Sequence, residues 1–130
     1  MMAKVYPSNL DDLRNQRLMT LAKEYTEKLQ NFTDAMVDTS REIEKQIETH
    51  VSWPNYYKLY NVFESCQNLL PITRDLAQAI SQHIEHGSLE LFAKLEIRLI
   101  LAELETAIRT AERLLFSSKI QHYIIESRVI

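Results

Sequence analysis

The stretch from Ser88 to Ile130 contains neither glycine nor proline, and this constrains the fold more than any other feature of the sequence. A long run without a helix breaker predicts one continuous helix over these residues. Its apolar residues are too numerous for the single buried stripe of a surface helix, because they recur on two adjoining faces. We therefore expect this helix to be covered on more than one side, either by the rest of the chain or by a second copy or partner.

The whole chain shares this shortage of helix breakers. Its 130 residues include 1 glycine and 3 prolines. Sheet proteins use glycine, proline and asparagine at frequent turns, so these low counts favour few chain reversals and long helices. The hydrophobic content of 45% and charged content of 25% are typical of a globular protein. We predict an all-α fold, with residues 1–130 forming a single domain.

Charge and hydropathy also exclude several classes of function. The net charge of -3 gives no general attraction to nucleic acid. No apolar run approaches the ~20 residues of a membrane span, and the first residues lack the apolar centre of a signal peptide. The single cysteine, Cys66, excludes an internal disulfide and suits a reducing compartment. We expect a cytoplasmic protein that binds neither nucleic acid nor membrane.

The first helix is predicted from Ser8 to about His50. Pro7 precedes it, Ser8 or Asn9 can cap it, and two aspartates occupy its first turn, where the helix dipole favours acidic side chains. Its apolar residues recur at steps of three and four, which is close to a heptad seam. This spacing predicts an amphipathic helix packed along its length.

The second helix is predicted after a break at Val51–Asn55, with Pro54 in its first turn. Pro71 lies in its middle, where it removes one backbone hydrogen bond and crowds the preceding turn. We expect a kink, or a split into two shorter helices, between Leu69 and Ile72. Gly87 should end this helix, and Ser88 should cap the next one.

Together these elements predict an elongated antiparallel bundle of three long helices, running up, down and up, with the second helix kinked or split near Pro71. The short links between the helices favour packing of the coiled-coil type.

The sequence offers little catalytic chemistry. His83 and His86 stand three residues apart near Glu90, a weak signal for a metal site. Cys66 falls on an apolar stripe and is interpreted as a buried core thiol. The acidic groups Glu24, Glu27, Glu42, Glu44 and Glu48 leave a metal-dependent helical enzyme as one alternative. We predict no catalytic residue, no cofactor and no metal.

A second alternative comes from the segment His83-Ile84-Glu85-His86-Gly87-Ser88, followed by Phe92 and Leu95. This segment resembles the motif of histidine phosphotransfer domains, in which a helical histidine accepts a phosphoryl group. The resemblance implies that His83 is the phosphorylated residue. The chain departs from the family pattern at His86, where lysine is usual, and at Ala93, where glycine is usual. The resemblance requires a helix that continues through Gly87 and an exposed His83.

The leading hypothesis is a non-enzymatic protein–protein interaction module, such as an adaptor, an inhibitor, an immunity-type protein or a chaperone. Tyrosine and tryptophan provide rigid contact area, and several crowd the start of the second helix. The outer face of the Ser88–Ile130 helix is the main predicted contact. An antiparallel homodimer is the simplest assembly that would bury it. Leu101→Glu should then dissociate the assembly and preserve the helices. The predicted partner-binding residues are Trp53, Tyr56, Tyr57, Tyr60, Leu91, Leu95, Leu101 and Ile108.

Overall fold

The computed structural model describes the backbone of residues 5–47 and 53–129 and the side chains of residues 10–46 and 55–127. Within these ranges the chain forms four helices and no strand: α1 (Val5–Ile47), α2 (Trp53–His86), α3 (Leu91–Leu115) and α4 (Ser118–Val129). The predicted all-α class is confirmed. The predicted count of three helices is wrong, because the last segment divides into α3 and α4.

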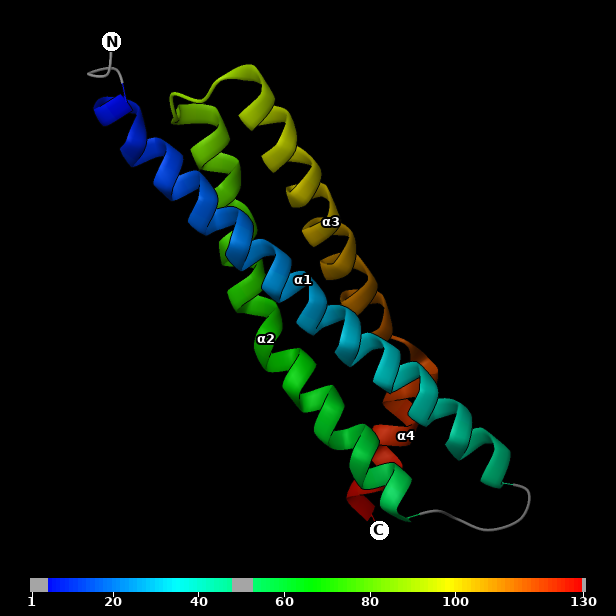
Figure 1. Ribbon diagram of the computed structural model, residues 1–130. Coiled ribbons are helices and arrows are strands. Elements are labelled where there is room, and N and C mark those ends of the chain that lie inside the picture. Colours follow the sequence, from blue (N-terminus) through cyan, green and yellow to red (C-terminus); the bar gives the residue numbers. More distant parts are fainter. Residues whose placement is uncertain (1–4, 48–52, 130) are drawn as a thin grey trace.

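The three long helices run antiparallel in the predicted order, and the bundle is elongated (Figure 1). α1 packs along both α2 and α3, while α4 packs mainly on α2 (Figure 1). α1 begins at Val5, three residues before the predicted start at Ser8. It is described to Ile47, so the predicted end near His50 lies outside the described residues.

The residues that α1 buries are not all apolar, and some of its leucines are exposed. Its buried apolar residues include Met19, Ala22, Leu29, Met36 and Ile43, and small polar residues are buried beside them: Asn15, Thr26, Thr33, Thr39 and Ser40. By contrast, Leu10 and Leu13 are exposed. Since α1 lies against two other helices, small side chains on its central seam let both backbones approach closely.

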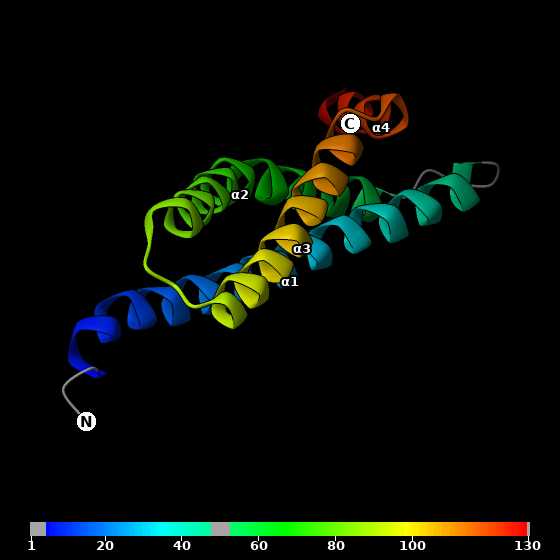
Figure 2. The same ribbon diagram turned by 90° about the horizontal axis from the view of Figure 1, so that it is seen from above.

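α2 remains one continuous helix through Pro71, so a split at this position is ruled out. Pro71 and Gln67 are exposed, and water can therefore bind the Gln67 carbonyl that lacks an amide partner. Nearby, the hydroxyl of Thr73 donates to the carbonyls of Leu69 and Leu70, at 3.3 and 2.7 Å. The axis of α2 bends along its length (Figure 2), as a proline and an inserted hydroxyl favour.

Gly87 follows the end of α2, as predicted, and its role is steric. Its φ is not positive, but a Cβ atom at this position would lie 2.6 Å from the carbonyl oxygen of His83. Ser88 does not cap the next helix, because Glu90 occupies the N-cap position of α3. Instead, the Ser88 amide donates to Asp11 Oδ2 at 3.1 Å and fastens the turn to α1.

The break between α3 and α4 falls at Phe116 and Ser117. The Ser117 hydroxyl accepts a bond from the Ile120 amide at 3.5 Å, in the manner of an N-cap. Beyond the break, Ile120, Tyr123 and Ile124 are buried at i, i+3 and i+4. Ile120, Tyr123 and Ile124 therefore dock on the bundle, and the chain turns at the break because docking buries them.

Candidate interaction surface

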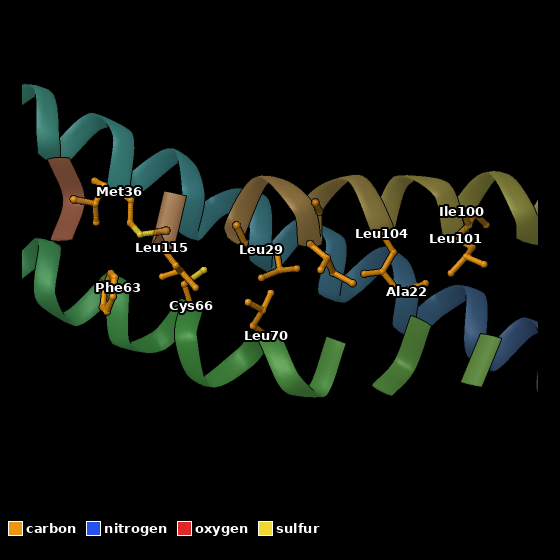
Figure 3. Packing of buried hydrophobic residues seen from close by; sticks show 14 of the residues in the cluster. Ala22, Leu29, Met36, Phe63, Cys66, Leu70, Ile100, Leu101, Leu104 and Leu115 are labelled. Atoms are coloured by element: carbon orange, nitrogen blue, oxygen red, sulfur yellow. The ribbon is translucent and has the colours of Figure 1, made fainter. Parts of the chain in front are cut away.

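α3 has one face in the core of the bundle. Figure 3 shows Ile100, Leu101 and Leu104 pointing between the helices toward α1 and α2. Leu101 is 9% exposed and Ile108 is 7% exposed. Leu101 and Ile108 were predicted to bind a partner, but they pack within the protein's own core. Leu101→Glu would place a charge there, so it would test folding instead of association.

The opposite face of α3 carries a second apolar stripe, which we call the outer seam: Phe92, Leu95, Leu99 and Ala102. All four residues are exposed, Phe92 at 77%, Leu95 at 47% and Leu99 at 68%. Their spacing of three, four and three residues is that of a coiled-coil seam. Leu91, at 67% exposed, borders this stripe. Of the predicted contact residues, Leu91 and Leu95 therefore lie on an open apolar surface.

Charged side chains flank the outer seam with a different sign on each side. Glu96 and Glu103 lie one heptad apart along one flank, and Arg98 lies on the other. All three are exposed, and no hydrogen bond or ion pair joins them to another described residue. Past Ala102 the stripe ends, because the next two seam positions are Thr106 and Arg109, which hydrogen-bond to each other at 3.2 Å.

The tyrosines at the start of α2 divide between core and surface. Tyr56 is buried, packs edge-to-face on Tyr123 with ring centroids 6.2 Å apart, and donates to Glu126 Oε2 at 2.6 Å. Tyr60 is half-buried against the core, and Tyr57 is 52% exposed. Trp53 begins α2, but its side chain lies outside the described residues. Tyr56 therefore joins α2 to α4, while Tyr57 is exposed on the surface of α2.

Burial raises the pKa of Tyr56 from 10.0 to about 12, and the hydrogen bond to Glu126 and the negative charge of that carboxylate add to the effect. Burial also raises the pKa of Tyr123. Both phenols remain protonated at neutral pH, so the Tyr56 hydroxyl stays available as the donor to Glu126.

A groove of about 860 Å³ lies between the first turns of α1 and the last turns of α2. Leu10 and Leu13 line it on one side, and His83 lines it on the other. The His83 ring is buried, and neither of its nitrogens has a hydrogen-bond partner in the structure. Burial lowers the pKa of His83; Asp11 opposes this effect, and Arg14 adds to it. The ring is therefore neutral at pH 7.

Both conditions of the phosphotransfer resemblance fail. α2 ends at His86, so no helix continues through Gly87, and His83 is buried where a phosphoryl donor could not reach it. Cys66 is fully buried, and burial raises its thiol pKa to about 11. The prediction that it is a core thiol is confirmed. A protonated, inaccessible thiol is a poor nucleophile.

The acidic residues that left a metal-dependent enzyme as an alternative are dispersed along α1. Glu24 pairs with Lys28 and Glu42 pairs with Lys45, each at 3.8 Å, while Glu44 pairs with Lys119 of α4 at 2.6 Å. Glu48 lies outside the described residues. Among the residues that the structure describes, no group of three or more His, Cys, Asp or Glu side chains is placed to hold a metal ion.

Within the described ranges, no helix combines the length and the apolar character needed to cross a membrane. The sequence matches no protein-family model, and neither a curated protein nor a solved structure is significantly similar to it. The arrangement of its own side chains is therefore the basis for assigning a function.

Proposed function

We propose that this protein is a non-enzymatic interaction module that associates with another helix through the outer seam of α3. The observation that carries the proposal is the exposure of Phe92, Leu95 and Leu99 on the side of α3 opposite the core. Scattered apolar residues are normal on protein surfaces, whereas a contiguous stripe at coiled-coil spacing marks a binding surface.

The outer seam also has the form of a protein-binding site. Its centre is apolar and its flanks carry charges without partners among the described residues. Protein interfaces have the same organisation, with an apolar centre and a polar rim. An amphipathic helix fits such a stripe, because its own residues at steps of three and four reach into the gaps between these side chains.

The test is the substitution Leu99→Glu. Light scattering of the purified protein measures self-association, and affinity purification from the native cell with mass spectrometry measures association with other proteins. We expect Leu99→Glu to abolish whichever association the wild-type protein shows. Since Leu99 is exposed, the free energy of unfolding should change by only about 0.5 kcal/mol.

Ile72→Glu is the matched control, because Ile72 is exposed on α2 and its substitution introduces the same charge. This variant should associate as the wild-type protein does. The proposal is wrong if the wild-type protein associates with nothing, or if Leu99→Glu retains its association.

A further inference from the structure

We infer that the partner on the outer seam is the α3 helix of a second copy of this chain, aligned in parallel with the first. This inference rests on the proposed function and adds the identity and direction of the partner. The inference rests on the charges beside the seam. Opposite charges meet when the two helices are parallel, and like charges meet when they are antiparallel.

In a parallel pair, each seam residue faces its own counterpart. Phe92, Leu95, Leu99 and Ala102 then form four successive apolar layers. Arg98 precedes the seam residue Leu99, and Glu103 follows the seam residue Ala102. Two parallel helices bring side chains at these two positions together across the seam. Arg98 of each copy therefore meets Glu103 of the other, which gives two identical ion pairs related by the twofold axis.

The remaining flank positions agree with this direction. Leu91 lies on the same side as Arg98, one heptad earlier, and it meets Glu96 of the second copy, whose aliphatic stem can cover it. Every group in these contacts is exposed in the single chain. None of these side chains has to leave the core to form the pair.

The antiparallel pair that brings all four layers together has a different outcome. Phe92 then lies opposite Ala102 of the second copy, and Leu95 lies opposite Leu99. Along one flank Glu96 faces Glu96 of the second copy, and along the other Arg98 faces Arg98. Like charges directly opposed across a helix pair are unfavourable, so the charge pattern disfavours the antiparallel dimer expected from the sequence.

Disulfide trapping of Ala102→Cys distinguishes the two directions. In the parallel pair the two introduced cysteines face each other in one seam layer. Their Cα atoms should then lie at about the 4.4–6.8 Å that a disulfide allows. In the antiparallel pair they are separated by ten residues along the helix axis, or about 15 Å. Cys66 is buried and does not compete. We expect mild oxidation to convert most of this variant to a covalent dimer.

Ser65→Cys is the matched control, since Ser65 is exposed on α2, away from the outer seam. It should form little covalent dimer at the same protein concentration. In an equal mixture of Phe92→Cys and Ala102→Cys, each variant should be joined mainly to its own kind, because each seam residue faces its counterpart in the parallel pair. Efficient joining of Phe92→Cys to Ala102→Cys, without an Ala102→Cys homodimer, overturns the parallel direction.

Charge exchange provides an independent test. Arg98→Glu alone and Glu103→Arg alone each replace two attractive pairs with two repulsive ones, so each variant should dimerise about tenfold more weakly than the wild-type protein. An equal mixture of the two variants restores both pairs and should recover the wild-type affinity at low salt. Equal weakening in the mixture overturns the assignment of Arg98 to Glu103.

These outcomes separate the inference from the proposed function. A wild-type protein that is monomeric by light scattering, but loses a different protein partner on Leu99→Glu, retains the proposed function and overturns the parallel homodimer. A dimer that is insensitive to Leu99→Glu overturns both.

Discussion

Tyr56→Phe tests whether the first aromatic residues of α2 hold the bundle together or serve a partner. The substitution removes one oxygen atom and preserves the ring that packs on Tyr123. The lost contact is the 2.6 Å hydrogen bond from the hydroxyl to Glu126, which joins α2 to α4. The substitution should therefore lower the free energy of unfolding at neutral pH and change how that free energy varies at alkaline pH.

At pH 7 the cost should be about 1–2 kcal/mol. A hydrogen bond to a charged group contributes roughly 1.5–3 kcal/mol. The lower end applies here, because the Glu126 side chain is 38% exposed and also contacts His122, at 2.7 Å. Water and His122 can therefore still satisfy the carboxylate. For a chain of this size the midpoint of thermal unfolding should fall by about 4–8 °C.

Above pH 10 the wild-type protein should lose an additional contribution to stability. The pKa of Tyr56 is about 12 in the folded protein and 10.0 in the unfolded chain. Between these values the folded state retains a proton that the unfolded state has lost, so the free energy of unfolding falls as pH rises. The contribution is complete below pH 10 and is lost by about pH 12, a total of about 2–3 kcal/mol. Phenylalanine cannot ionise, so Tyr56→Phe should lack this loss.

The assay is urea denaturation followed by circular dichroism at pH 7, 10 and 11.5. Tyr57→Phe is the matched control, because Tyr57 is the exposed neighbour and its substitution should change stability by less than about 0.5 kcal/mol at every pH. If Tyr56→Phe has the stability of the control at pH 7 and the alkaline slope of the wild-type protein, the assignment of Tyr56 to the α2–α4 contact is refuted.

Two further predictions concern the core, and each has its own control variant. Because burial lowers the pKa of His83, the wild-type protein should lose stability as pH falls below 6.5, where the unfolded chain binds a proton that the folded state excludes. His83→Leu should remove this loss in denaturation curves at pH 7.5 and 5, whereas His86→Gln should retain it; identical pH profiles for both variants would contradict the account. Leu104→Ala should lower the free energy of unfolding by about 2–5 kcal/mol, and Leu99→Ala by less than about 0.5 kcal/mol, so equal effects would show that the two faces of α3 are misassigned.

Much of the architecture was predictable because its signals are local. Low glycine and proline counts, apolar residues at steps of three and four, Pro54 in a first turn and Gly87 after a helix each act within a few residues of themselves. Helix formation depends on such short-range contacts, so the long helices and their antiparallel order could be anticipated.

The break at Phe116 and Ser117 was less predictable. Two consecutive serines can cap a new helix, but they can also lie within a continuous one. The chain turns because Ile120, Tyr123 and Ile124 become buried against the bundle. That gain depends on α2, which lies many residues earlier in the sequence, and no local pattern reports it.

The candidate interaction surface was likewise predictable only in part. The helical period established which apolar residues of α3 share a face, and it supplied the charges beside each face. Tertiary structure decided which face enters the core: Leu101 and Ile108 pack inside, whereas Leu95 and Leu99 stay exposed. Both faces are apolar, so composition alone does not tell which of them enters the core. Only the contacts of α3 with α1 and α2 select one of them, and those contacts exist only once the helices have come together.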